Sequence, residues 1–388
     1  MKNIENIILN FKETRVQSKI ICEPLEIEDY VVQPRAEVSP PKWHLAHTTW
    51  FFEEMILKKH CPKYQIFDEN FTILFNSYYK TLGNHWHQNE RGILSRPTVN
   101  NIFAYRKHVD EALINFINTQ PISSEVLDLL EIGIHHEKQH QELLLMDIKS
   151  ILASNIDFPA YNEDLIESYK QIDTSFSKID EGLYEIGHYK DNFSYDNERP
   201  RHKVYVQSSK IQNQLITNGE FLDFINQDGY KNSVFWLSKG FSWINENNIH
   251  CPLYWRMIDN TWYEYNLSGL KAIDLNAPVK HISYYEASAY AKFRGLRLPT
   301  EFELEIFFKR NQIKNDLWNW SSSHYSPYPG FKEFSGSLGE YNGKFMCDQY
   351  VLRGGCFATP KNHLRDTYRN FFEPHQRWMF SGIRLAKD

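Results

Sequence analysis

Apolar side chains recur at the spacing of an α-helix through roughly the first 155 residues, and this spacing predicts helices rather than strands. The best-marked helix begins at Ser39, where a capping hydroxyl precedes Pro40 and Pro41 in the first turn. Together with this one, four helices are predicted, and they cover a segment before residue 24 and residues 39–59, 97–117 and 123–153. Helices of this number and length favour a four-helix bundle.

The helical pattern weakens after residue 160. We place a linker at residues 161–178, between a helical domain, 1–160, and a second domain, 179–388. The second domain has short apolar runs, many Gly, Trp, Tyr and Asn residues, and few long helical stretches. Helices are predicted there at residues 218–226 and 284–293, and a capping box at 300–303 opens a third. The chain is therefore expected to be α+β, with a helical bundle followed by an irregular α+β domain.

The composition excludes several classes of protein. The chain has 388 residues, 41% of them hydrophobic and 24% charged, which suits a globular protein of two domains. A net charge of -6 without a concentrated basic face argues against nucleic acid as a partner. The N-terminus lacks the pattern of a signal peptide, and no segment approaches the roughly 20 apolar residues of a membrane span. The five cysteines form no CxxC pair and indicate reduced thiols in a cytoplasmic protein.

The sharpest local signal is the run HHEKQHQE, which begins at residue 135 inside the last predicted helix of the bundle. Residues four apart on a helix share one face, one turn from each other, and His136 and His140 have this relation. Two imidazoles placed in this way can bind one metal ion.

A metal site in a bundle also needs a ligand from a facing helix. The helix after Ser39 offers His44 and His47, both set among aromatic residues, and the spacing does not choose between them. Both could also simply pack against those aromatic rings. Nearby carboxylates could orient the imidazoles without touching the metal, namely Glu54, Glu137 and Asp147. Three neutral imidazoles suit a zinc hydrolase or an iron oxygenase, and the chemistry leaves this choice open.

Longer motifs resemble a known family. In the first half these are WHLAHTTWFFEEMIL, FNSYYKTLGNHW, RGILSRPT and HHEKQHQELLLMDIK, which are similar to the DinB-like domain of the ergothioneine sulfoxide synthases (EgtB, hercynine oxygenase). The second half carries FRGLRLPTEFELE, WNWSSSHYSPYPGF, VLRGGCFATP and YRNFFEPHQRWMFSGIRLA, which resemble the formylglycine-generating-enzyme or sulfatase-modifying-factor domain. The resemblance covers nearly the whole chain. It implies a DinB-like four-helix bundle followed by a C-type-lectin-like α+β domain.

The resemblance also implies a metal, its ligands and a reaction. The HLxHTxWFxE context marks His47 as the third ligand beside His136 and His140, with His44 structural, and the implied ion is Fe(II). The family reaction uses O2 to join a thiol, cysteine or γ-glutamylcysteine, to ring carbon 2 of hercynine, and it oxidises the sulfur to a sulfoxide. Holding both substrates on one metal would make the coupling effectively intramolecular.

Further residues match family positions around the substrates. Tyr78 and Tyr79 follow FNS, at a place where tyrosines of one branch are implicated in proton or hydrogen transfer during the oxygen chemistry. Gln139 matches a position that contacts the betaine substrate. Phe371 and Phe372 match positions that line its trimethylammonium end, where aromatic faces attract a quaternary cation.

The thiol donor is the point at which the chain departs from the actinobacterial type of the family. Gln88 stands where that type has a basic residue, and Pro360 stands where it has an Asp. Both of those groups help to hold γ-glutamylcysteine, and a buried charge without a partner is costly. We therefore predict free cysteine as the preferred donor, with its carboxylate held by Arg91, Arg96 or Arg369.

Three other classes of function compete with this hypothesis, and the first comprises other sulfur- or selenium-transferring members of the same superfamily. OvoA-like enzymes attach cysteine to ring carbon 5 of histidine, and SenA-like enzymes attach a selenosugar to hercynine. A zinc-dependent DinB-type thiol transferase or hydrolase would use the same three histidines with another metal. A sugar- or peptide-binding module is conceivable because the second domain resembles C-type lectins. Metal content and O2 consumption would separate these classes.

Overall fold

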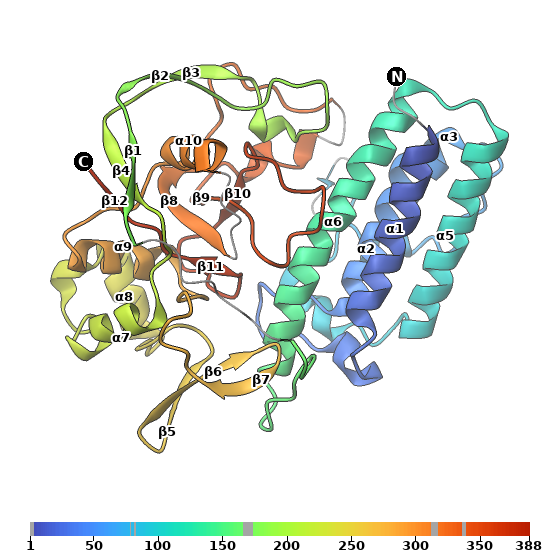
Figure 1. The fold of residues 1–388 in the computed structure, drawn as a ribbon. Coiled ribbons are helices and arrows are strands. Elements are labelled where there is room, and N and C mark those ends of the chain that lie inside the picture. The colour runs from blue at the N-terminus through green and yellow to red at the C-terminus, as the bar shows by residue number, and fades with distance from the viewer. Residues whose placement is uncertain (1–3, 78, 81–82, 166–173, 312–316, 336–338) are drawn as a thin grey trace. The chain divides into compact units, whose positions relative to one another are not determined.

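The computed structural model describes the chain except for residues 1–3, 78, 81–82, 166–173, 312–316 and 336–338 (Figure 1). The chain divides into two compact units. The helical unit comprises Met1–Glu163 and Ala358–His363, and the mixed unit comprises Asp164–Phe357 and Leu364–Asp388. Part of the linker predicted at 161–178 lies outside the described residues. The grouping of 358–363 with the helices was not anticipated from the sequence.

Four long helices make up most of the helical unit, and they lie side by side in Figure 1. The last helix packs against the first and second, and the second packs against the third. They are α1 (Ile4–Cys22), α2 (Pro41–Phe52), α5 (Val99–Thr119) and α6 (Ser124–Leu152). A π-helical turn (Glu53–Leu57) and α3 (Lys58–His60) continue α2, and the short α4 (Phe71–Leu74) follows. The predicted four-helix bundle is therefore confirmed.

Two of the helix starts have the side-chain caps that capping signals in the sequence describe, but the cap predicted at Ser39 is wrong: α2 begins after Pro40, without a side-chain cap, and the Ser39 hydroxyl accepts a hydrogen bond from Arg91. Thr98 and Ser123 each accept a hydrogen bond from a backbone N–H in the first turn of α5 and α6, and Pro41 occupies the first position of α2. Gly133 lets α6 approach α2 closely, because a Cβ there would lie 2.5 Å from the Phe52 ring. Gly133 is two residues before the HHEKQHQE run, so this close approach lies near the candidate metal ligands on α6.

Among its described residues, the mixed unit contains short strands in four small sheets, with strand orders β1-β4-β12, β10-β9-β8-β11, β2-β3 and β5-β6-β7. The pairing is antiparallel except for β11 with β8. The strands are β1 (Phe176–Ile179), β2 (Gly182–Ile186), β3 (His202–Val206), β4 (Ser209–Gln212), β5 (Trp255–Ile258), β6 (Thr261–Asn266), β7 (Gly269–Ala272), β8 (Trp318–His324), β9 (Tyr350–Arg353), β10 (Asn370–Phe372), β11 (Ser381–Gly382) and β12 (Ala386–Lys387).

Helices α7 (Asn218–Asn226), α9 (Tyr284–Phe293) and α10 (Glu301–Asn311) confirm the three helices predicted in this half. The fourth, α8 (Ser238–Glu246), was missed because it begins without a side-chain cap and contains Gly240. An apolar core lies between α10 and strands β1 to β4 and includes Ile186, Ile211, Leu304 and Phe307. The α+β fold class is as expected. Among the described residues, no helix is both long and apolar enough to cross a lipid bilayer.

Candidate metal centre

Three histidine side chains from two facing helices converge inside the helical unit. His47 comes from α2, and His136 and His140 come from successive turns of α6. One nitrogen of each ring lies within 4.8 Å of the corresponding nitrogens of the other two. His47 and His136 are each 1% exposed and are shielded from water, whereas His140 is partly exposed. This spacing is close enough for one metal ion to be bound by all three rings.

The orientation of His47 is set by its own bundle. Its Nδ1 lies 2.6 Å from the backbone carbonyl oxygen of Phe75, so Nδ1 carries the proton and donates a hydrogen bond to that oxygen. The ring also stacks with Trp43 at 4.6 Å and with Trp50 at 5.6 Å between ring centres. Its Nε2 is buried and has no hydrogen-bond partner among the described residues. That nitrogen therefore presents a lone pair, as a metal ligand requires.

Burial keeps the three rings neutral. It lowers the pKa of His136 to about 3. Burial, together with the repulsion that protonated neighbouring histidines would exert, holds the pKa values of His47 and His140 well below their ordinary range. Neutral imidazole is the form that binds metals, so the donor set fits a divalent transition-metal ion. The three nitrogen donors by themselves suit both iron and zinc.

The three carboxylates considered from the sequence have different partners. Glu54 accepts hydrogen bonds from Lys58 and Thr72, away from the histidines. Asp147 lies 2.8 Å from Nε2 of His44, whose Nδ1 lies 2.9 Å from Nδ1 of His140. Of the three, Asp147 is therefore the carboxylate connected to the cluster through a histidine. His44 stands behind a candidate ligand, as a supporting residue.

Glu137, next to His136 on α6, anchors the bundle electrostatically. Its two oxygens accept hydrogen bonds from Arg15 at 2.9 Å, Arg106 at 2.6 Å and Ser18 at 2.6 Å. Burial alone would raise the pKa of this carboxyl, but Arg106 and Arg15 outweigh it and lower the pKa to about 2. The cluster ties α6 to α1 and α5, and it fixes the turn that carries His136.

Of the tyrosine pair, Tyr78 lies outside the described residues. Tyr79 is fully buried, and its ring centre lies 5.5 Å from that of Trp50, which itself stacks with His47. Asn76 holds the backbone of this turn, since its side chain accepts from Tyr79 N–H and donates to Tyr79 C=O, both at 3.0 Å. The Tyr79 ring thus contacts a neighbour of the candidate ligand.

The three arginines proposed for the donor carboxylate have different surroundings. Arg91 is buried in the helical unit, with its guanidinium carbon 3.3 Å from the Trp43 ring centre and a hydrogen bond to Ser39. Trp43 stacks on His47, so Arg91 lies one ring away from the cluster. Arg369 belongs to the mixed unit, where it makes two hydrogen bonds of 2.9 Å to Glu301 and one each to two backbone carbonyls. The guanidinium of Arg369 is therefore engaged by a carboxylate and two carbonyl oxygens within the mixed unit.

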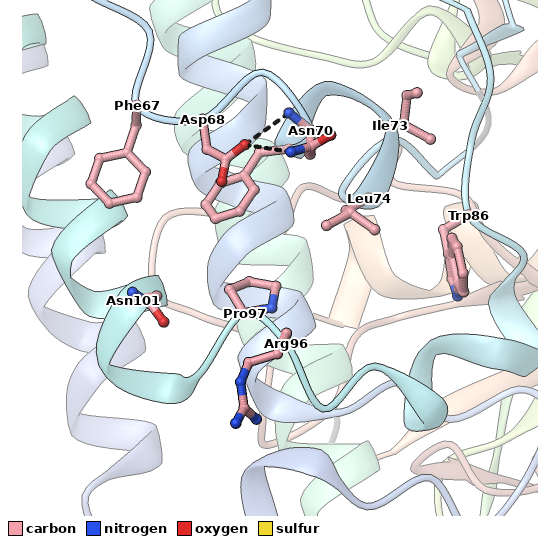
Figure 2. A pocket seen from close by; sticks show the side chains of 10 residues that line it. Phe67, Asp68, Asn70, Ile73, Leu74, Trp86, Arg96, Pro97 and Asn101 are labelled. Carbon is pink, nitrogen blue, oxygen red and sulfur yellow. Dashed lines mark hydrogen bonds between the residues drawn. The ribbon is translucent and has the colours of Figure 1, made fainter.

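The third arginine, Arg96, is exposed and lines a pocket of about 530 Å³ at the surface of the helical unit. Figure 2 shows this pocket with Phe67, Asp68, Leu74 and Trp86 among its walls. Asp68 is engaged with the backbone and side chain of Asn70. The three histidines do not line this pocket. Its wall α4 leads directly into Phe75, the hydrogen-bond acceptor of His47.

The predicted betaine-binding residues lie in different units. Gln139 precedes His140 on α6 and is partly buried. Phe371 and Phe372 lie on β10 of the mixed unit. Phe371 stacks on Tyr325 with ring centres 4.0 Å apart, and Phe372 packs edge-on against Trp378. Both phenylalanine side chains therefore have partners within the mixed unit.

Sequence reasoning missed the contacts of the segment 358–363 with α6. Thr359 donates a hydrogen bond of 2.5 Å to Glu142, and His363 lies 3.0 Å, nitrogen to nitrogen, from His135. This segment contains Pro360, the position at which the donor-binding pattern departs from the actinobacterial type. Its contacts are with residues on the helix that carries His136 and His140. No local signal in the sequence predicts that Thr359 contacts Glu142, which is 217 residues away in the chain.

Comparisons with known proteins assign a family to each half of the chain. Residues 163–310 and 311–388 match the Sulfatase-modifying factor enzyme 1-like domain, and residues 10–144 match the DinB superfamily. The chain is 31% identical over 242 residues to a protein of Mycobacterium tuberculosis named hercynine oxygenase, covering 50% of this chain and 56% of that protein.

Two further relatives agree with these matches. A hercynine oxygenase of Mycolicibacterium smegmatis is 28% identical over 309 residues, with 66% of this chain and 70% of that protein covered. Ergothioneine biosynthesis protein 1 of Schizosaccharomyces pombe is 30% identical over 232 residues, or 50% of this chain and 28% of that protein. The matched region thus spans between roughly half and two thirds of the bacterial relatives.

Proposed function

The chain belongs to the hercynine oxygenase (EgtB) family, and from this premise we propose that it is a sulfoxide synthase of ergothioneine biosynthesis that joins a thiol to ring carbon 2 of hercynine. The observation that carries the proposal is the buried cluster of three neutral imidazoles from two facing helices. The proposed cofactor is Fe(II), the co-substrate is O2, and the location is cytoplasmic. This proposal accounts for the joint presence of the bundle site and the second domain.

In this proposal, His47, His136 and His140 hold the iron. When bound, the iron would supply O2 activation and a point of attachment for the thiolate. Trp43 and Trp50 stack on the His47 ring and keep water from this ligand. Gln139 binds the carboxylate of hercynine through its amide. Phe371 and Phe372 bind its trimethylammonium group through their ring faces.

Arg91 is the residue that we propose for the donor carboxylate, because it is buried beside Trp43 in the same unit as the cluster. Gln88 offers no charge, and its amide group is already engaged with the backbone carbonyl of Glu37. Pro360 offers neither a charge nor a backbone N–H. A donor with a further amine and carboxylate would therefore find fewer partners here than cysteine does.

The function is tested by a grid of donors and acceptors. With Fe(II) and O2, we expect hercynine plus cysteine to give a sulfoxide substituted at ring carbon 2, identified by mass spectrometry and NMR. We expect kcat/KM for cysteine to exceed that for γ-glutamylcysteine by about tenfold, a difference of about 1.4 kcal/mol. A preference for histidine would instead support an OvoA-like activity, and a preference for a selenosugar would support a SenA-like activity.

The tyrosine pair is proposed to direct the outcome between sulfoxide formation and simple dioxygenation of the thiol. An acid near the reacting oxygen contributes about 10²–10⁴-fold to such a step. Substituting Tyr78 and Tyr79 by Phe, singly and together, should therefore change the product ratio far more than the KM for hercynine. Tyr105→Phe is the matched control, since this tyrosine is equally buried in the bundle but donates to Glu53. An unchanged product ratio in all three variants would reject the role.

A further inference from the structure

A chain of hydrogen bonds leads from the start of α2 to one of the candidate ligands. Asp147 Oδ2 accepts the backbone N–H of Ser39 at 2.8 Å, and the same oxygen lies 2.8 Å from Nε2 of His44. On the other side of the His44 ring, Nδ1 lies 2.9 Å from Nδ1 of His140. Asp147 and His44 are 2% and 4% exposed, so the chain is inside the bundle.

The positions of the protons along this chain follow from its one unambiguous acceptor. Because Asp147 Oδ2 accepts from Ser39, it is an acceptor for His44 as well, and Nε2 of His44 carries the proton. With the proton of the neutral ring on Nε2, Nδ1 of His44 has a lone pair, which accepts a hydrogen bond from Nδ1–H of His140. The remaining lone pair of His140 is on Nε2.

We propose that Asp147 and His44 are positioning residues that set the tautomer and the orientation of the His140 ring, so that its Nε2 faces the cluster as a ligand. The inference rests on the proposed metal-binding role of His140, and it extends that role to two residues outside the cluster. The Phe75 carbonyl sets the tautomer and the orientation of the His47 ring in the same way. His47 is therefore oriented by a backbone carbonyl, and His140 is oriented by the side chains of His44 and Asp147.

The chain of hydrogen bonds from Ser39 through Asp147 and His44 to His140, called the relay below, has further contacts at Ser39 and at His44. Ser39 donates its N–H to Asp147, and its hydroxyl accepts a hydrogen bond of 2.8 Å from Arg91. The His44 ring also lies against Trp43, with ring centres 5.8 Å apart. An imidazole fixed in this way loses little freedom when the metal binds, and outer partners of this kind typically contribute about 10–100-fold to metal affinity.

The test compares two variants of similar size. His44→Gln keeps an acceptor for His140 and a donor for Asp147, whereas His44→Leu keeps neither. Titration of the metal-free full chain with Co²⁺, followed by its visible absorption, should show affinity reduced by about 10–100-fold in His44→Leu. The affinity of His44→Gln should stay within a few-fold of the original chain. Tyr105→Phe, which removes a hydrogen bond elsewhere in the bundle, should leave it unchanged.

Long-range ¹H–¹⁵N NMR of the metal-free chain provides a readout that packing alone would not change. The expected tautomers are Nε2–H for His44 and Nδ1–H for His140. A His140 ring protonated on Nε2, or equal Co²⁺ affinity in the Leu and Gln variants, would overturn the relay. If the unsubstituted chain binds no metal although both tautomers are as expected, the proposed function fails and the relay geometry stands.

Discussion

Replacing His136 by Ala is expected to remove the metal from the purified protein while leaving the bundle folded. The substitution leaves two imidazoles, His47 and His140, and two nitrogen ligands bind a divalent ion far more weakly than three. The expected loss of affinity exceeds the roughly 100-fold upper range of an outer supporting residue. Metal content by mass spectrometry after reconstitution with Fe(II), together with far-ultraviolet circular dichroism, measures both parts of this result.

His135→Ala is the matched control for this experiment. His135 is the adjacent residue on α6 and is also buried, but its ring faces His363 of the segment 358–363 rather than the cluster. This variant should keep its metal. Full iron occupancy in His136→Ala would contradict the ligand assignment. Retention of zinc but not iron by the unsubstituted chain would favour a DinB-type thiol transferase.

Replacing Glu137 by Gln is expected to lower the free energy of unfolding by about 3–5 kcal/mol, because it leaves a buried charge without its partner. Arg106 is fully buried, and among the described residues its ion-pair partner is Glu137. Urea unfolding followed by circular dichroism measures the change as a shift of the midpoint.

Glu53→Gln tests whether the charge or merely the burial matters. Glu53 is 1% exposed, like Glu137, but it accepts hydrogen bonds from the hydroxyls of Tyr64 and Tyr105 rather than from arginines. Its substitution should cost about 1 kcal/mol, the typical net value of a hydrogen bond. Equal losses in the two variants would show that the ion pairs to Glu137 add nothing.

The stabilisation from Glu137 should also depend on pH in a defined direction. The pKa of this carboxyl is lowered from its ordinary 4.5 to about 2 in the folded protein. The unfolded chain therefore takes up the proton first as the pH falls. The contribution of the charged Glu137 to the free energy of unfolding is complete above about pH 4.5 and is lost progressively toward pH 2. The difference between the original chain and Glu137→Gln should narrow over the same window.

The sequence by itself determined the features that depend on neighbouring residues. The helix starts predicted near residues 97 and 123 agree with α5 and α6, which begin after the capping hydroxyls of Thr98 and Ser123, and the spacing of His136 and His140 predicted that they share one face. These signals are local, because a cap or a helical face involves residues within one or two turns. Helix α8 lacks such a signal and was missed for that reason.

Tertiary structure alone decided which atoms meet across helices. Spacing on α2 did not separate His44 from His47. Their different roles come from Phe75, whose carbonyl oxygen accepts a hydrogen bond from His47 Nδ1, and from Asp147, which is 103 residues from His44 in the chain. The close approach of α2 and α6 at Gly133 sets this arrangement. Periodicity reports which face of a helix is buried, and it does not report what that face will touch.

The same reason explains the placement of the segment 358–363. Thr359 binds Glu142 across 217 residues of chain, and the segment groups with the helices although strands precede and follow it. Such a contact forms because folding brings a hydroxyl and a buried carboxylate together, and each stabilises the other once water is excluded. Only the folded chain contains this information, since neither partner has a signal in its own neighbourhood.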